Sequence, residues 1–340
     1  MNYRLVVRPE VDADLLEVEA PQASVPSLFF LLSPVQSRNT YGPKNDMNPR
    51  EFFINPAEFG LPTRDELVAY RIWDNHFHGF AAKSPIEQYE RNNFFVERMG
   101  IERSIAQEVG GTLEEPFAPY PYDVEILKIL ERDKDHLSGR TPIDPGFPDE
   151  SCGKIKKWIR DGPCIGIKYP GTGKKAVTCS HPNNDPIMRL AAELDVHVYI
   201  HTWLKVGGVP RLPGGGNLES ESTPMDVAKL AQRFPNVAMI CGHSGGDWEL
   251  GVRAVRPFKN VLLEFSGSDP HSGMVEYAIQ ELGVDRLVWG GHGPSRSYAT
   301  ELGKVLDADI SRADRMKIFG GNLRRISASI FRKKGMKIEL

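Results

Sequence analysis

The chain has 340 residues, of which 40% are hydrophobic, and a formal net charge of −3 from 42 Lys and Arg against 45 Asp and Glu. This length allows one large domain or two ordinary ones, each with a real core. The balanced charge argues against a nucleic-acid-binding protein, and no apolar segment approaches the roughly 18 residues of a membrane span. We therefore expect a cytoplasmic protein without nucleic-acid or membrane partners.

The first seventy residues differ in composition from the rest of the chain. Prolines and asparagines are concentrated between Ser33 and Arg64, which favours turns over continuous strands or helices. The aromatic pairs Phe29-Phe30 and Phe52-Phe53 would be costly to leave in water. We expect residues 1–70 to form an arm or lid that packs on the main body or on the second copy in a homodimer.

From Arg71 onward, short apolar runs alternate with amphipathic stretches, which is the pattern of repeated strand and helix units. A capping residue followed by proline predicts helix starts at Ser84-Pro85, Asp185-Pro186 and Thr223-Pro224. The eight predicted strands are Ile72 to His78, Arg103 to Val109, Leu137 to Asp144, Ile165 to Tyr169, Val196 to Thr202, Val237 to His243, Val261 to Ser266, and Arg286 to Gly290.

Eight such units over residues 71–332 match the roughly 250 residues of a (β/α)8 barrel. A doubly wound sheet is the competing fold. We predict an α/β chain folded as a (β/α)8 TIM barrel with an N-terminal extension. Polar residues follow many different strands, as they do at a barrel mouth, whereas an open sheet uses one switch point. The basic residues 333–340 are expected to form a solvated tail, and the four cysteines, which include no C-x-x-C pair, to be reduced thiols.

The strongest chemical signal is the segment Asp74-Asn75-His76-Phe77-His78 on the first predicted strand. Side chains alternate along a strand, so Asp74, His76 and His78 share the face that points into a barrel. A lone histidine on a strand is usually structural, but two unpaired imidazoles side by side in a core would be costly. We predict that His76 and His78 bind one metal ion, with Asp74 deeper in the barrel as an orienting partner.

Two further histidines, His201 and His243, each end a predicted strand directly before a loop. Either one alone reads equally well as a hydrogen-bonded core imidazole. Beside the pair on the first strand, both become candidate site residues. Four other histidines are treated as background: His136, His181, His197 and His271.

The order of these motifs along the chain resembles the order found in the amidohydrolase superfamily. The chain is most similar to its branch related to aminocarboxymuconate-semialdehyde decarboxylase, whose members are described as metal-dependent hydrolases of the TIM-barrel fold. The resemblance covers essentially the whole predicted barrel, and the first seventy residues lie outside it. The motifs that carry it are Asp74-x-His76-x-His78 on the first strand, His201 on the fifth, His243-Ser-Gly-Gly on the sixth, and Trp289-Gly-Gly-His292-Gly-Pro294 on the eighth.

The resemblance implies roles for individual residues. His76, His78 and His201 would ligate one divalent metal ion, with zinc as the expected metal, and its bound water would act as hydroxide near neutral pH. His243 would stand beside the metal and exchange protons with the substrate. Lys168, which ends the fourth strand, would form an ion pair inside the barrel or contact a substrate carboxylate.

The chain departs from the family pattern at His292. The family normally has an aspartate there, which contacts the metal and takes the proton from the nucleophilic water. An imidazole can ligate zinc or act as a base, but it brings no negative charge. His292 is therefore a catalytic candidate whose presence fits a different reaction, a weakened enzyme or a mutated chain.

Several other charged residues allow either a structural role or a role in binding or converting the substrate. Glu108 and Glu264 are acids in apolar strands, and they either pair with Lys168 or a histidine or act on the substrate. Arg296, after the eighth strand, either binds a substrate carboxylate or is an ordinary surface arginine. Asp247 is expected to cap the helix that follows it.

Three hypotheses about function follow. The first is a metal-dependent hydrolase that uses a metal-bound hydroxide on a small polar amide, ester or lactone. The alternative is a metal-dependent non-oxidative decarboxylase of a small carboxylate on the same scaffold. The third, prompted by His292, is a weakly active or non-catalytic ligand-binding barrel.

Overall fold

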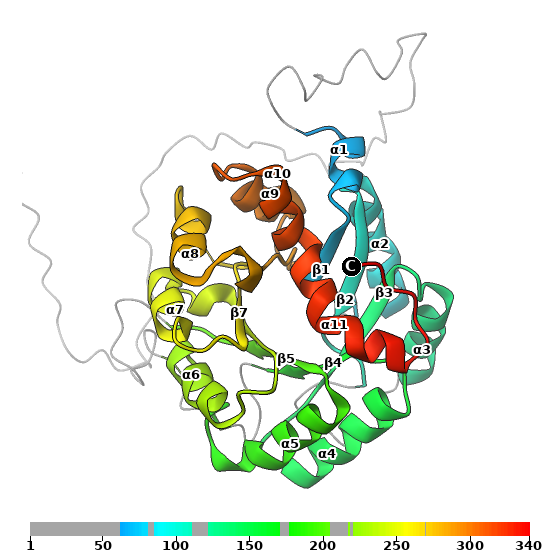
Figure 1. Cartoon of the computed structure of the whole chain (residues 1–340). Helices are drawn as coiled ribbons and strands as arrows, with labels where there is room; N and C mark the ends of the chain where they lie inside the picture. Colours follow the sequence, from blue (N-terminus) through cyan, green and yellow to red (C-terminus); the bar gives the residue numbers. More distant parts are fainter. Residues whose placement is uncertain are drawn as a thin grey trace, which may run out of the picture. The chain divides into compact units, whose positions relative to one another are not determined.

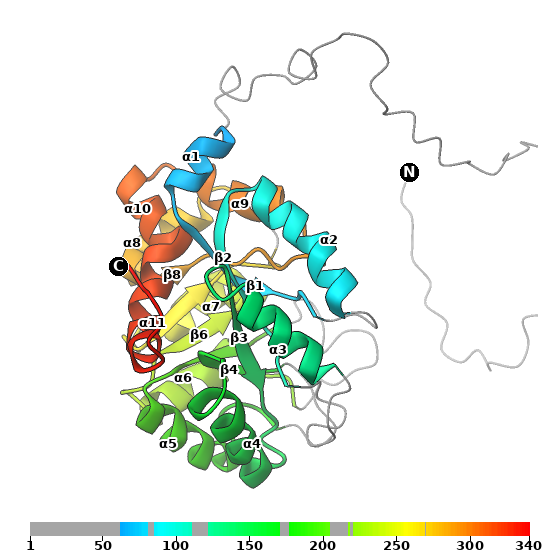
Figure 2. The same ribbon diagram turned by 90° about the vertical axis from the view of Figure 1, so that its right-hand side faces the viewer.

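The computed structural model describes residues 62–80, 85–110, 122–170, 177–204, 217, 220–268 and 270–340. Eight parallel strands pair in sequence order, from β1 to β8, and helices surround them (Figure 1, Figure 2). This is the predicted (β/α)8 barrel. The doubly wound alternative is wrong, because its strand order reverses at a switch point and this order does not.

Each of the eight predicted strands is present, but most end earlier than predicted. Pairing stops where the chain turns into the loops at the carboxyl end of the barrel, so His78 and His243 lie just after their strands. The observed strands are Ile72–Phe77 (β1), Ile101–Ala106 (β2), Leu137–Pro142 (β3), Gly166–Tyr169 (β4), His197–His201 (β5), Met239–Gly242 (β6), Val261–Glu264 (β7) and Leu287–Val288 (β8).

The predicted helix starts at Pro85 and Pro224 are confirmed. The helix at Asp185 begins one residue earlier than predicted, because a 3-10 turn over Pro182–Asn184 leads directly into it. The helices are Arg64–Ala69 (α1), Pro85–Arg98 (α2), Asp123–Arg132 (α3), Pro148–Ile155 (α4), Asp185–Leu194 (α5), Pro224–Arg233 (α6), Trp248–Val255 (α7), Met274–Leu282 (α8), Tyr298–Leu306 (α9), Arg312–Met316 (α10) and Asn322–Lys333 (α11).

Main-chain contacts between β1 and the segment after β8 draw the two ends of the sheet together. The Asn75 N–H donates to the Trp289 carbonyl oxygen at 3.2 Å, and the His78 N–H donates to the Gly293 carbonyl oxygen at 2.8 Å. These bonds satisfy polar groups that a sheet edge would otherwise leave open. They also bring His292, between these two partners of β1, next to the first strand.

The structure describes part of the predicted N-terminal arm and all of the predicted C-terminal tail. Residues 1–61 of the predicted arm lie outside the described residues, but residues 64–69 form α1, whose Leu67 is buried in the core. The predicted basic tail, residues 333–340, also packs against the barrel. Lys334 Nζ donates to the carbonyl oxygens of Ile159 and Gly162, and Met336 packs against the core. A lysine stem can cover apolar surface while its ammonium group serves two carbonyls.

The cysteines behave as the sequence predicts. All four are free thiols, and Cys164, Cys179 and Cys241 are buried. Burial raises the pKa of Cys164 to about 12, so this thiol stays protonated and unreactive. In the described part of the chain, no helix is long and apolar enough to cross a membrane.

Candidate metal centre

Five histidines gather at the carboxyl ends of the strands. His76 belongs to β1 and His78 follows it, His201 ends β5, His243 follows β6, and His292 follows β8. This is the end of the barrel where enzymes of this fold carry their active sites. The five histidines that the sequence analysis selected therefore lie at one site.

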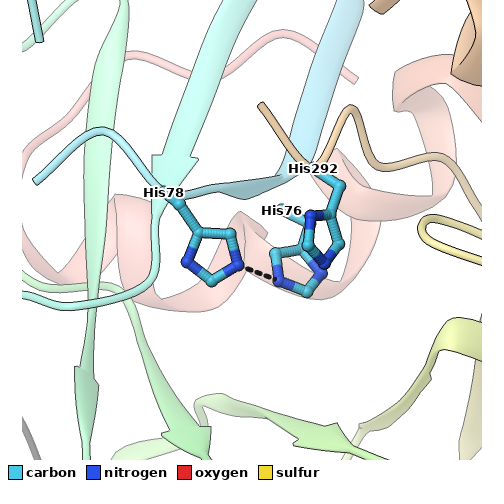
Figure 3. Close-up of side chains that lie close together, drawn as sticks. All are labelled: His76, His78 and His292. Carbon is cyan, nitrogen blue, oxygen red and sulfur yellow. Dashed lines mark hydrogen bonds between the residues drawn. The ribbon is translucent and has the colours of Figure 1, made fainter. Parts of the chain in front are cut away.

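His76 lies at the centre of this group. The centroid of its ring is 4.3 Å from that of His292, 4.7 Å from that of His78 and 4.9 Å from that of His243. Figure 3 shows the rings of His76, His78 and His292 close together, and each of these three offers a nitrogen within 4.8 Å of the other two. His201 lies against His243 instead, with its Nδ1 3.0 Å from His243 Nε2.

The backbone is strained at two of these residues. His243 has a φ of 59° and His292 a φ of 51°, in the left-handed region that few non-glycine residues adopt. Gly267 lies beside both rings and has a φ of 76°. A Cβ on it would lie 2.9 Å from His243 Nδ1 and 3.3 Å from His292 Cδ2, so a larger residue would crowd both imidazoles.

Hydrogen-bond partners assign the tautomers of His78 and His243. His78 Nδ1 contacts a carboxylate oxygen of Glu108, and His243 Nδ1 lies 2.6 Å from the carbonyl oxygen of Ser266. Both partners are acceptors, so each Nδ1 carries the proton and donates it. The Nε2 atoms of His78 and His243 are therefore unprotonated, and they lie 2.8 Å from His76 Nε2 and 3.0 Å from His201 Nδ1.

His292 has the same tautomer. The Ser295 hydroxyl donates its proton to the carbonyl oxygen of His292 at 2.9 Å, and the same hydroxyl oxygen contacts His292 Nδ1. That oxygen can only accept from the ring, so Nδ1 carries the proton. His292 Nε2 therefore has a free lone pair.

The spacing of His76 and His78 suits the binding of one divalent metal ion. The Nε2 atoms of His76 and His78 lie 2.8 Å apart. Two imidazole nitrogens that bind one zinc ion at about 2.1 Å would be about 3.4 Å apart at the tetrahedral angle and about 3.0 Å apart at a right angle, so metal binding would move these two nitrogens slightly apart. Neutral imidazoles are ligands that suit zinc and other first-row transition metals.

Burial keeps these imidazoles neutral. Desolvation lowers the pKa of His243 to about 4 and that of His292 to about 2. It also lowers the pKa of His76 and of His201 well below the ordinary histidine value. Because a histidine must be unprotonated to ligate a metal, these four histidines are ready to bind one without first losing protons.

Both acids pair with histidines, which is one of their two predicted interpretations. Glu108 contacts His78, as described above. Glu264 is fully buried, and its Oε2 accepts from the His243 N–H at 3.0 Å and lies 3.8 Å from His76 Nδ1. These contacts hold the histidines in place and place negative charge behind them.

The two aspartates singled out by the sequence analysis act on the main chain. Asp74 Oδ1 accepts from the N–H groups of His76 at 2.8 Å and Gly291 at 2.7 Å. It therefore orients the backbone beside the site rather than an imidazole. Asp247 caps α7, as predicted, by accepting from the Leu250 N–H at 3.1 Å.

The two predicted substrate-binding cations occupy different surroundings. Lys168 is buried at the end of β4, with Nζ 4.0 Å from the centre of the Tyr199 ring. It makes no hydrogen bond or ion pair with the residues that the structure describes, and burial lowers its pKa to about 7. Arg296 is exposed and donates to the Gly267 carbonyl oxygen at 3.0 Å.

Sequence analysis missed two buried polar residues beneath the histidines. The Tyr199 hydroxyl lies 2.7 Å from His76 Nδ1. Arg140 of β3 is fully buried and donates to His197 Nε2 at 3.0 Å and to the Asn75 carbonyl oxygen at 2.6 Å, so His197 has a structural role. The available signals were an arginine within a predicted strand and a tyrosine on the same strand face as a site histidine.

A family model described as Amidohydrolase matches residues 74–326. The chain belongs to the amidohydrolase family. The match begins at Asp74 on β1 and ends within α11, so it includes all five histidines and confirms the resemblance seen in the sequence. No curated protein matches this chain.

Solved structures of the same fold include three with related chemistry in their names. The 2,6-dihydroxybenzoate decarboxylase from Rhizobium is 16% identical, with a TM-score of 0.57 over 76% of this chain and 98% of that one. A dihydroxybenzoic acid decarboxylase from a Polaromonas species, with bound manganese and an inhibitor, is 17% identical, with a TM-score of 0.55 over 70% and 85%. A putative amidohydrolase from Staphylococcus aureus is 14% identical, with a TM-score of 0.59 over 76% and 98%.

Proposed function

We propose that the protein is a metal-dependent decarboxylase that removes CO2 from a small hydroxy-substituted aromatic acid without oxidation. The observation that carries the proposal is Lys168, a buried cation without an anionic partner among the described residues, next to a group of neutral histidines. The two dihydroxybenzoate decarboxylases of the same fold support the choice of reaction and substrate class.

Lys168 would bind the substrate carboxylate. A buried ammonium group without a partner is costly, and a carboxylate would remove that cost. Its charge contributes to the lowered pKa of His76, His243 and His292, so it acts on the same space as the histidines. Arg296, anchored to the Gly267 carbonyl oxygen, is the predicted second contact to the substrate from the loop after β8.

The metal would be held by His76 and His78, with His292 and the ligand implied by the family, His201, as the candidates for the remaining positions. When bound, a divalent ion supplies positive charge that polarises and orients the substrate oxygens. Imidazole donors suit zinc, which the sequence analysis expects. The Polaromonas enzyme binds manganese, an ion that favours oxygen ligands.

His243 would move the proton. Its Nδ1–H is held by the Ser266 carbonyl oxygen, so Nε2, which His201 Nδ1 contacts at 3.0 Å, carries the lone pair that would take a proton from a substrate hydroxyl and return it to the ring carbon once the substrate displaces His201. The carbon–carbon bond to the carboxylate then breaks, CO2 leaves, and the electron pair of that bond stays with the ring. Overall, the carboxylate group is exchanged for one hydrogen.

A metal-dependent hydrolase is the second candidate function. It is favoured by His292, whose Nε2 lone pair faces the histidine group and can act as a base toward water. Of the two acids at the site, Glu264 is held by the Tyr199 hydroxyl and the His243 N–H. Glu108 contacts His78 through Oε1, and its Oε2 has no hydrogen-bond partner among the described residues, so it is the carboxylate oxygen that could activate water in such a hydrolase.

Product analysis in isotopically labelled water separates the two functions. The metal-loaded protein is incubated with hydroxybenzoates and with amides, esters and lactones. A decarboxylase releases CO2 in equal amount to the arene, places one solvent deuterium on its ring in D2O, and adds no ¹⁸O from water to it. A hydrolase adds ¹⁸O to its product and releases no CO2.

A variant of the proposed proton carrier tests the mechanism. His243→Asn should lower the rate of CO2 release by about 10²–10⁴-fold, whereas the remote control His136→Asn should not.

A further inference from the structure

Three buried side chains from three strands form a row beneath the histidine group. The Tyr199 hydroxyl oxygen, on β5, lies 3.0 Å from Glu264 Oε2, on β7, and 2.7 Å from His76 Nδ1, on β1. All three side chains are fully buried. The row therefore links a carboxylate to a predicted metal ligand through one phenol.

The direction of the protons in this row follows from Glu264. Its carboxylate can only accept, and it receives hydrogen bonds from the Tyr199 hydroxyl, from the His243 N–H at 3.0 Å and from the Ser266 N–H at 2.8 Å. The phenol has a single proton, which it donates to Glu264. Its oxygen can then only accept from His76, so His76 Nδ1 carries the proton.

We propose that Tyr199 is a positioning residue: its hydroxyl, oriented by Glu264, holds the His76 proton on Nδ1 and leaves the Nε2 lone pair free for the metal. The contact of 2.8 Å between His76 Nε2 and His78 Nε2 (Figure 3), which has the length of a hydrogen bond, would then hold no proton and would bring two lone pairs together. Such a pair repels unless a cation lies between, so the row raises the affinity of the centre for a metal. The inference rests on the metal centre of the proposed function.

The surrounding backbone leaves space for this row. A Cβ on Gly242 of β6 would overlap the Tyr199 hydroxyl, and a Cβ on Gly290 after β8 would overlap Glu264 Oε1. Glycine at these two positions thus leaves room for the phenol of Tyr199 and the carboxylate of Glu264. Ser266 Oγ lies 3.2 Å from His76 Nδ1 and provides a second acceptor for the same proton.

A phenylalanine at position 199 separates this role from a purely structural one. The ring packs under Lys168 Nζ at 4.0 Å and beside the Arg140 guanidinium at 5.3 Å, and phenylalanine keeps both ring contacts. Burial, reinforced by Glu264, raises the pKa of Tyr199 well above its ordinary value. The phenol therefore keeps its proton, and Tyr199→Phe removes only the hydroxyl.

The first test measures Mn²⁺ binding to the metal-free full chain by calorimetry, without substrate. Tyr199→Phe should weaken Mn²⁺ binding by about 10–100-fold, as loss of such supporting groups does elsewhere. Tyr169→Phe is the matched control, because Tyr169 is a buried tyrosine on β4 whose hydroxyl, among the described residues, reaches the carbonyl oxygens of Val177 and Thr178 and no site histidine. Equal affinity in the wild type and Tyr199→Phe would overturn the inference.

The second test is ¹⁵N NMR of the histidines in the metal-free wild type, with His76→Gln used to assign the signal. The inference requires the His76 proton on Nδ1 in the wild type, and a loss of this preference in Tyr199→Phe and Glu264→Leu. A wild-type His76 protonated on Nε2 would overturn it even if neither variant folds. A wild type that binds no Mn²⁺ would refute the proposed function, while the NMR result would still decide the role of Tyr199.

Discussion

The imidazole rings of His76 and His292 lie with their centroids 4.3 Å apart, although β1 opens the barrel and β8 closes it. Main-chain bonds from Asn75 and His78 to the segment after β8 bring the two rings together. Position 292, where the family normally has an aspartate, therefore borders the histidine pair directly. A neutral group stands there in place of a negative charge.

Replacing His292 with aspartate should restore that charge. We expect His292→Asp to raise kcat for hydrolysis at least about tenfold, since a well-placed general base contributes about 10²–10⁴-fold. The check is kcat and metal content of both forms over a pH series. A variant that is no faster than the parent at equal metal content would show that His292 suits this protein's own reaction.

His76 and His78 should provide most of the affinity for the metal. We expect the double variant His76→Ala, His78→Ala to lose most bound metal and to keep its fold, because ligands at a barrel mouth contribute little to the core. Elemental analysis gives the metal content and circular dichroism the fold. Unchanged metal stoichiometry would remove the basis of the site.

The remaining ligand position can be decided by two single variants. The structure groups His292 with His76 and His78, whereas the family resemblance implies His201. We expect His292→Ala to weaken Mn²⁺ binding more than His201→Ala does. The reverse order, in the same calorimetric titration, would favour the family assignment and would mean that His201 turns away from His243 when metal binds.

Substrate binding should depend on pH through Lys168. Its pKa is lowered to about 7 by burial, so the ammonium group is present below pH 7 and is lost as the pH rises through that value. We expect KM for an aromatic carboxylate to rise above about pH 7. Lys168→Arg is the control, because an arginine stays charged and its KM should lack this rise. A wild-type KM that is constant from pH 6 to 9 would exclude Lys168 from carboxylate binding.

Much of the site could be predicted from sequence because each of its histidines ends a strand or follows one. Period-two alternation placed His76 and His78 on one face, strand ends placed His201 and His243 at the same end of the barrel, and the family resemblance added His292. The contact between His201 and His243 could not be predicted, because the left-handed backbone at His243 sets the direction of its side chain. The arm and the homodimer stay predictions, since residues 1–61 lie outside the described residues.

The supporting residues were harder to predict. Tyr199 and Arg140 lie in strand segments that read as ordinary core, and their partners are on strands far away in the sequence: His76 is 123 positions from Tyr199, and Asn75 is 65 positions from Arg140. Periodicity gives the face on which a side chain lies. It does not give the partner across the barrel, which depends on register and on the space that Gly242 and Gly290 leave open.

The most direct test of the central claim is CO2 release from 2,6-dihydroxybenzoate and related hydroxybenzoates by the metal-free full chain during titration with Mn²⁺. The account predicts no release without metal and a rate that rises to a plateau at one Mn²⁺ per chain. CO2 release that does not depend on Mn²⁺, or no release from any hydroxybenzoate once Mn²⁺ is bound, would contradict it.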